Sequence, residues 1–175
     1  MSDGIFIADG GCYVPTEHAR GPWDPRALHG GAPSALIATV FERLQPGAEL
    51  PIARLSFELL RPVPMEPLRV VTEIVRSGRR VQELRAELLA GEELVARASA
   101  LRVQAVPAVA AQAAIQPAQP DAPMPPVADA EGIAFTLDES SHASFAAAME
   151  MRSFGDARAP GPARVWMRPR HPLLA

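Results

Sequence analysis

Cysteine is almost absent from the sequence, which has only Cys12 among its 175 residues. A single cysteine excludes an internal disulfide framework and a zinc site built on several cysteines. Lysine and asparagine are missing, and all 17 basic residues are arginines, a bias that we attribute to codon usage rather than to function. Because the formal net charge is −3, we do not expect the chain to bind nucleic acid through its phosphates.

Long hydrophobic runs and common catalytic signatures are lacking too. No apolar stretch approaches the roughly 18 residues of a membrane-spanning helix, and residues 1–4 do not resemble the start of a signal peptide. We therefore expect a soluble, cytoplasmic protein with no membrane partner. The sequence has no phosphate-binding or dinucleotide-binding glycine loop, no serine-hydrolase elbow and no cluster spaced for a metal. It predicts neither a metal nor a cofactor.

A proline-rich segment divides the chain. Residues 107–126 contain six prolines, one charged residue and no aromatic residue, a composition typical of a semi-rigid linker. We therefore predict three parts, which are an N-terminal domain of residues 1–105, a linker of residues 106–128 and a C-terminal part of residues 129–175.

The N-terminal domain is rich in strand patterns. Residues 52–60 alternate, with Leu55, Phe57 and Leu59 on one face. Further strands are predicted at residues 68–76, 80–89 and 94–103. The alternation of the third strand slips near Gln82, which predicts a bulge there. These strands are longer than the usual length of about five or six residues, and they indicate a strongly curved antiparallel sheet.

One segment of this domain has a clear helical pattern. Residues 33–45 begin with a proline in the first turn and end before Pro46 and Gly47. Apolar residues lie on nearly every side of this helix, as is typical of a buried helix. One buried helix inside a long, curved antiparallel sheet is the hotdog arrangement, and we therefore predict an α+β hotdog fold.

The C-terminal part begins the same pattern again. Residues 148–154 and 164–168 are predicted strands, and neither a second helix nor a second set of long strands follows them. We expect them to open a second hotdog domain that is incomplete. Their apolar faces are expected to pair with the first sheet, with another copy of the chain in a homo-oligomer, or with a missing C-terminal segment.

The residues just before the helix form the candidate site. His29, Gly30 and Gly31 precede it directly, where glycines allow a ligand to approach the backbone and the helix start offers N–H groups and a positive dipole end. Such a site suits a thioester carbonyl, whose oxygen gains negative charge during attack. Pro33 has no N–H, so the candidate donors are Gly30, Gly31 and Ala32. The alternative is that the glycines only permit a tight turn.

Three side chains near this turn are candidates for a role in the site. His29 is either a general base or a hydrogen-bonded structural residue. Asp24 is placed either to orient His29 or to cap the turn at Pro25. Trp23 is expected to pack over the core, with substrate contact as the alternative.

Three motifs together resemble the acyl-CoA thioesterase II-like branch of the hotdog superfamily. They are Gly-Pro-Trp-Asp-Pro-x-x-x-His-Gly-Gly at residues 21–31, Phe-Glu-Leu-Leu-Arg-Pro-Val-Pro at residues 57–64 and Val-Arg-Ser-Gly-Arg-Arg-Val at residues 75–81. The resemblance covers about residues 5–104 and resumes at about residues 145–174. It implies a double hotdog that hydrolyses fatty acyl-CoA to a free acid and CoA without a metal or redox cofactor.

The chain departs from the family where a catalytic acid is needed. In single-hotdog thioesterases with the His-Gly-Gly motif, an acidic residue lies on the helix at the position that is Ala38 here. The helix has no carboxylate before Glu42. In the resembled branch, the catalytic Asp comes from the second hotdog, at a position that would follow Ala175. The resemblance therefore implies that this chain carries the scaffold and acyl-CoA-binding half of a thioesterase-like protein.

Two other functions stay open. The missing carboxylate fits a non-catalytic module that binds acyl-CoA or an acyl chain. The spacing of Asp24 and His29 also resembles that of the (R)-specific enoyl-CoA hydratases, in which such a pair activates water. The asparagine of the hydratase motif is absent from this sequence.

Overall fold

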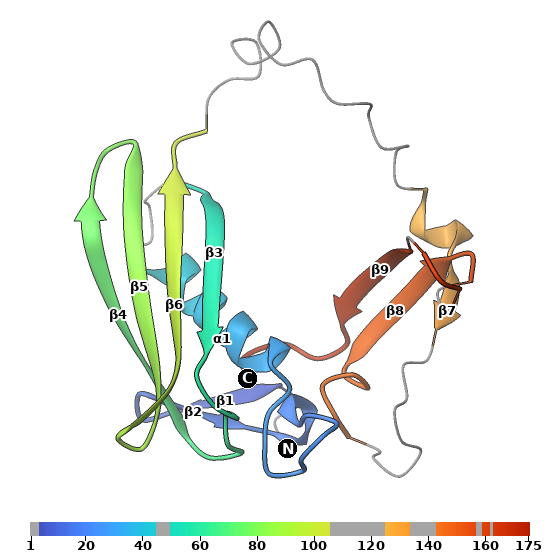
Figure 1. Cartoon of the computed structure of the whole chain (residues 1–175), viewed down its shortest axis with the longest axis horizontal. Helices are drawn as coiled ribbons and strands as arrows, with labels where there is room; N and C mark the ends of the chain where they lie inside the picture. The colour runs from blue at the N-terminus through green and yellow to red at the C-terminus, as the bar shows by residue number, and fades with distance from the viewer. Residues whose placement is uncertain (1–3, 45–49, 106–124, 134–142, 157–158, 162) are drawn as a thin grey trace, which may run out of the picture.

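The computed structural model of the chain describes residues 4–44, 50–105, 125–133, 143–156, 159–161 and 163–175. In this part of the chain, the main elements are one α-helix and two antiparallel sheets, which Figure 1 shows on either side of the chain termini. The predicted linker lies largely outside the described residues, so the three-part division stays a prediction.

The first sheet has six strands in the order β1-β2-β4-β5-β6-β3. Its strands are β1 (Phe6–Asp9), β2 (Cys12–Pro15), β3 (Ile52–Leu59), β4 (Leu68–Ser77), β5 (Val81–Ala90) and β6 (Glu93–Val103). The lengths of β4, β5 and β6 are 10, 10 and 11 residues, which confirms the predicted long strands. Strands β1 and β2 form a hairpin, and with four residues each they are too short to display a clear alternation.

The predicted bulge lies in β4, and its assignment to β5 is wrong. Ile74 pairs with Leu84 while Arg76 pairs with Glu83, so β4 carries one extra residue at this point. Strand β5 alternates without interruption, and its Gln82 points inward with 6% of its surface exposed. The apparent slip in the sequence pattern is therefore a buried polar residue at an inward position.

Helix α1 (Gly31–Arg43) packs on the inner face of this sheet (Figure 1). It begins two residues before the predicted start, with Gly30 as its N-cap, and the predicted last residue, Gln45, lies outside the described residues. The prediction of burial on every side is wrong in part, because the sheet covers one side only. The covered side consists of Ala32, Pro33, Leu36, Ile37 and Phe41, whereas the opposite side is half-buried.

A buried arginine joins the helix to the sheet. Arg102 of β6 is 3% exposed, and its guanidinium donates to the carbonyl oxygens of Phe41 and, at 2.9 Å, Leu44. These carbonyls lie at the C-terminal end of α1, where a helix lacks internal donors and its dipole is negative. Arg102 also donates to the side-chain oxygen of Gln82 at 3.4 Å. The two buried polar residues thus fix the end of the helix.

The second sheet has the order β7-β8-β9. Strands β8 (Met149–Phe154) and β9 (Arg164–Pro169) confirm the two predicted strands, while β7 (Glu131–Ile133) has only three residues and was missed. Two short 3₁₀-helices complete the described elements, η1 (Glu17–Ala19) and η2 (Val127–Asp129).

The last residues of the chain return to the first sheet. The N–H groups of Ile5 and Phe6 donate to the carbonyls of Pro172 and Leu173, each at 2.9 Å, and the Ala175 N–H donates to the Phe6 carbonyl at 3.0 Å. Residues 172–175 therefore lie alongside β1. The expected pairing of β8 or β9 with the first sheet is not present among the described residues, because these strands pair with each other and β8 also pairs with β7.

Candidate functional site

The chain between η1 and α1 is a loop fastened at its base. The Gly21 N–H donates to the Ala27 carbonyl at 2.8 Å, and the His29 N–H donates to the Ala19 carbonyl at 3.0 Å. On its other side, the Leu28 N–H donates to the Val63 carbonyl at 2.8 Å. These bonds hold His29 at the start of helix α1, as the sequence predicted.

His29 closes the first turn of the helix. Its Nδ1 accepts a hydrogen bond from the Gly31 N–H at 3.0 Å, and its carbonyl accepts one from the Ala32 N–H at 2.9 Å. Burial of the ring lowers the pKa of His29 below its ordinary value of 6.5. The imidazole is therefore neutral at pH 7, and the hydrogen bond to Nδ1 assigns its proton to Nε2.

Of the three candidate amide donors, Gly30 is the one left free. The N–H groups of Gly31 and Ala32 are bonded to His29, whereas that of Gly30 has no hydrogen-bond partner among the described residues. A methyl group added at Gly30 would meet only the Cδ1 of Leu59, at 3.0 Å. Gly30 itself is half-buried, and the neighbouring Leu59 is 50% exposed.

Phe145, which the sequence did not mark as a site residue, packs against this turn. Its ring stacks on the His29 imidazole with the ring centres 4.8 Å apart and the planes at 13°. A methyl group added at Gly31 would lie only 2.8 Å from the Phe145 ring. The Phe145 N–H donates to the carbonyl of Arg20 at 3.0 Å. Gly31 is therefore required by a packing contact within the protein.

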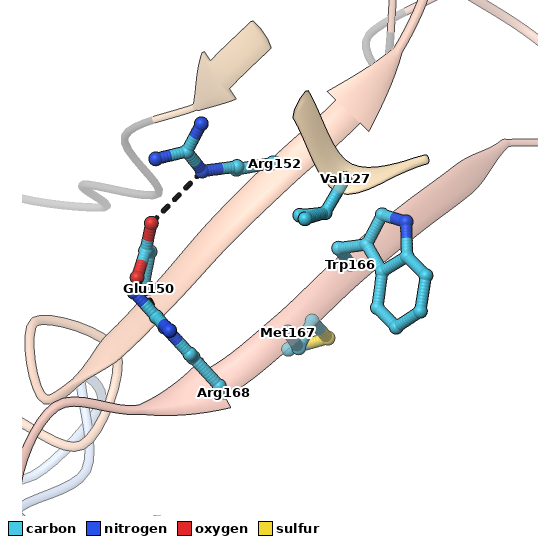
Figure 2. Close-up of a pocket in the computed structure, with 6 residues that line it drawn as sticks. All are labelled: Val127, Glu150, Arg152, Trp166, Met167 and Arg168. Carbon is cyan, nitrogen blue, oxygen red and sulfur yellow. Dashed lines mark hydrogen bonds and ion pairs between the residues drawn. The ribbon is translucent and has the colours of Figure 1, made fainter. Parts of the chain in front are cut away.

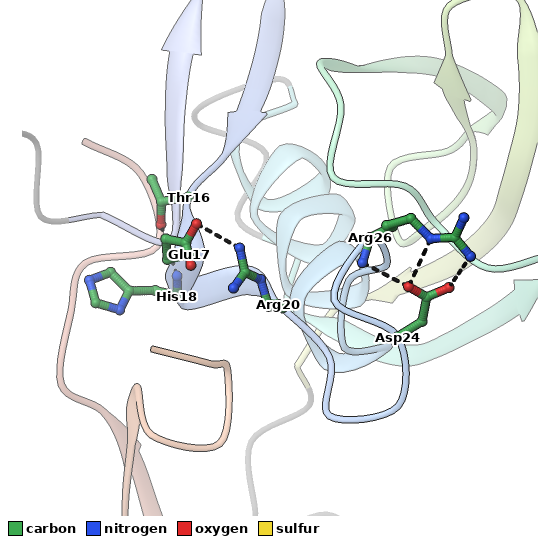
Figure 3. A network of polar contacts seen from close by, with 6 residues as sticks. All are labelled: Thr16, Glu17, His18, Arg20, Asp24 and Arg26. Atoms are coloured by element: carbon green, nitrogen blue, oxygen red, sulfur yellow. Dashed lines mark hydrogen bonds and ion pairs between the residues drawn. The ribbon is translucent and has the colours of Figure 1, made fainter. Parts of the chain in front are cut away.

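The predicted partner of His29 is engaged elsewhere. Figure 3 shows Asp24 facing Arg26, which donates to it from its backbone N–H at 2.8 Å, from Nε at 3.1 Å and from Nη2 at 3.0 Å. The hydrogen bonds from Arg26 hold the pKa of the Asp24 carboxyl below its usual value. In the described part of the chain, no hydrogen bond or ion pair joins Asp24 to His29. The structure does not bring the two residues together.

Trp23 lies at the tip of the same loop and is 85% exposed. The prediction that it packs over the core is wrong, because the hydrogen bond between Gly21 and Ala27 closes the base of the loop and leaves its tip in solvent. At the base of the loop, Arg20 forms an ion pair with Glu17 at 2.6 Å (Figure 3).

Helix α1 offers His29 no acid in its first turns. Ala38, the helix position that lacks the acid of single-hotdog thioesterases, is half-buried, and Glu42 is exposed near the far end of α1. Among the residues that the structure describes, no carboxylate is bonded to the imidazole, and no group of three or more histidine, cysteine, aspartate or glutamate side chains is arranged to hold a metal ion.

A separate cavity of about 390 Å³ lies against the second sheet, lined by Val127, Glu150, Arg152, Trp166, Met167 and Arg168. Figure 2 shows Glu150 between the two arginines. Their Nε atoms donate to it at 2.8 Å from Arg152 and 2.5 Å from Arg168. These bonds lower the pKa of Glu150 and make it a weak base. None of the predicted site residues lines this cavity.

Comparisons with known proteins agree with the fold. Structures similar to this chain include a predicted thioesterase from Novosphingobium aromaticivorans, with 21% identity, a TM-score of 0.65, and coverage of 95% of this chain and 65% of that one. A hotdog-fold protein from Alicyclobacillus acidocaldarius has 17% identity, a TM-score of 0.64, and coverage of 95% and 61%. A predicted thioesterase II from Thermobifida fusca has 17% identity, a TM-score of 0.54, and coverage of 87% and 52%. These similarities confirm the hotdog fold.

This chain therefore spans less than two thirds of the length of each of these structures. No curated protein matches its sequence. Within the described residues, no helix combines the length and the apolar content needed to cross a membrane. Residues 19–103 match the family described as the acyl-CoA thioesterase N-terminal domain. The matched residues include α1 and β3 to β6, so the hotdog domain of this chain is similar to that family.

Proposed function

We propose that this chain binds acyl-CoA thioesters as the substrate-holding half of a thioesterase, with the thioester carbonyl at the Gly30 N–H. The observation that carries the proposal is the free Gly30 amide at the start of α1, next to the exposed Leu59. The helix dipole adds positive potential at the same point. The match of residues 19–103 to the acyl-CoA thioesterase N-terminal domain supports the choice of substrate.

The Gly30 N–H suits the charge that develops in thioester hydrolysis. As water attacks the carbonyl carbon, the carbonyl oxygen becomes negative, and the carbon–sulfur bond then breaks to release the acid and the CoA thiol. A single backbone donor to such an oxygen contributes roughly 10²- to 10³-fold in rate. The helix start can therefore polarise the substrate before any base acts on the water.

The proposal assigns His29 a positioning role instead of the general-base role that the sequence suggested. Its Nδ1 lone pair already accepts the Gly31 N–H, and its Nε2 carries the proton, so neither nitrogen is free to take a proton from water. Asp24 is a poor base as well, because Arg26 lowers its pKa. The hydratase alternative lacks comparable support, since it requires these two residues to act as a pair.

Without a positioned base, attack by water loses the roughly 10²- to 10⁴-fold that general-base catalysis contributes. We therefore propose that the chain alone holds the thioester and does not hydrolyse it. The lack of a positioned base among the described residues also favours the non-catalytic acyl-CoA-binding module, which is the second candidate function. The two candidates agree on the binding site and differ in whether a further polypeptide segment adds the missing base.

Calorimetric titration with a panel of acyl-CoA thioesters tests the site. In Gly30→Ala, the added methyl group meets only the flexible end of Leu59, so the domain should fold while the methyl group blocks the approach to the amide. We expect its dissociation constant to rise at least roughly tenfold, a loss of about 1.4 kcal/mol. The control is Gly132→Ala in β7, where an added methyl group meets nothing within 4 Å. Equal affinities of the two variants would contradict the proposed site.

A further inference from the structure

Phe145 reaches the candidate site from outside the hotdog domain. It lies beyond the family-matched residues 19–103, and it belongs to the C-terminal part, which also contains β7 to β9. A hydrogen bond from its N–H to the Arg20 carbonyl, at 3.0 Å, fastens it to the base of the site loop. The next turn is fixed too, because Ser144 Oγ accepts from the Ala147 N–H at 3.2 Å and Ser144 is only 7% exposed.

The Phe145 ring has two neighbours at the helix start. It covers one face of the His29 imidazole, with a centre-to-centre distance of 4.8 Å. Its edge fills the space that a side chain at Gly31 would occupy. Leu59 lies beside Gly30, the neighbouring residue. Two apolar side chains thus lie beside adjacent residues of the helix start, Leu59 from β3 at Gly30 and Phe145 from the C-terminal part at Gly31.

We propose that Phe145 is a wall of the acyl-CoA site and the positioning residue for His29, so that the two parts of the chain build the site together. This inference rests on the proposed function. By covering the imidazole, Phe145 keeps Nδ1 in its bond with the Gly31 N–H. This bond occupies the Gly31 amide and leaves the Gly30 amide as the donor for the thioester.

The ring also accounts for the environment of His29. The imidazole contacts the Phe145 ring and the Gly31 amide, and burial alone lowers its pKa, with no charged group contributing. Removal of the aromatic ring should therefore expose His29 to water. Its pKa should then rise toward the ordinary value of 6.5.

Two measurements on Phe145→Ala test the proposal. The first follows the His29 ring protons by NMR as a function of pH, with the signals assigned by comparison with His29→Gln. The second is calorimetric titration with an acyl-CoA. The control is Phe154→Ala in β8, the same substitution in the same part of the chain. Circular dichroism checks that both variants are folded.

We expect the His29 pKa to rise in Phe145→Ala and acyl-CoA binding to weaken by roughly 2- to 10-fold, while Phe154→Ala changes neither. A pKa that rises with unchanged affinity would overturn the proposal, because Phe145 would then only cover His29. An unchanged His29 pKa, or tighter binding of acyl-CoA, in Phe145→Ala would overturn the proposal as well. If the unmodified chain binds no acyl-CoA, the proposed function fails and the wall role fails with it, while the pKa still decides whether Phe145 positions His29.

Discussion

At Gly31, an added methyl group would lie 2.8 Å from the Phe145 ring and 3.1 Å from Nδ1 of His29, whereas at Gly30 it would meet only the Leu59 side chain. The two glycines therefore have different roles, although they are adjacent. Gly31 makes room for an aromatic ring of the protein itself, and Gly30 leaves its backbone open. A substitution at Gly31 would disturb packing and ligand binding together, so Gly30 is the informative position.

The buried imidazole of His29 predicts a pH dependence of stability. Its pKa is near 6.5 in the unfolded chain and lower in the folded one. Between these two values, the unfolded state binds more protons, so the free energy of unfolding falls as the pH drops below about 6.5. We expect urea titrations at pH 7.5 and pH 5.5 to show that the free energy of unfolding falls more between these pH values in the unmodified protein than in His29→Gln. Equal losses would mean that His29 titrates normally in the fold.

The site was predictable in part at this scale. The sequence alone places the motif around His29 and Gly30 at a helix start, because glycines and a first-turn proline are local signals of that position. Phe145 was not predictable, because more than 100 residues of sequence separate it from His29 and no periodic pattern surrounds it. The engagement of Asp24 by Arg26 was missed for a related reason, since sequence spacing alone does not decide between two nearby partners.

At the scale of elements, α1 depends on a polar contact within an apolar core. Arg102 is 3% exposed and supplies donors to two carbonyls at the C-terminal end of the helix. Replacement by methionine would keep much of the side-chain volume and leave both carbonyls without these donors. A buried polar group that loses its partner costs about 1–3 kcal/mol.

We therefore expect Arg102→Met to lower the free energy of unfolding by about 2 kcal/mol in a urea titration. The matched control is Arg97→Met in the same strand, where the side chain is 54% exposed and forms an ion pair with Glu87 at 3.6 Å. Exposed ion pairs contribute little, so this control should change stability by about 0.5 kcal/mol or less. Similar losses in both variants would contradict the capping role of Arg102.

The longest elements display a clear period in the sequence, and the shorter strands β3, β8 and β9, of 8, 6 and 6 residues, were predicted as well. Strands β4 to β6 and helix α1 each extend over ten residues or more. The bulge was assigned to β5 because Gln82 breaks its apolar pattern, while the extra residue itself lies in β4, where apolar and β-branched residues hide it. Sequence patterns record side-chain polarity and do not record strand register.

At the scale of the whole molecule, described residues from the two predicted parts of the chain contact each other, and two of these contacts matter here. Phe145 contacts His29, and residues 172–175 pair with β1. The half-buried Leu174 packs against the core that contains the fully buried Phe6. This second contact gives the C-terminal part a direct effect on the stability of the hotdog domain.

We expect Leu174→Ser to lower the free energy of unfolding by about 1–2 kcal/mol, because it removes apolar contact with the core. Leu60→Ser is the control, since Leu60 is 44% exposed, and it should have an effect of about 0.5 kcal/mol or less. Thermal and urea unfolding of the two variants check this expectation. A loss confined to Leu60→Ser would show that residues 172–175 do not stabilise the first sheet.

The release of free thiol from acyl-CoA by the purified chain tests the central claim most directly, when it is measured on the same samples in which calorimetry detects binding. The account predicts saturable acyl-CoA binding without thiol release at a useful rate, because Nδ1 of His29 is bonded to Gly31 and Asp24 is held by Arg26. Rapid thiol release that His29→Gln or Asp24→Asn abolishes would contradict it and would identify the base.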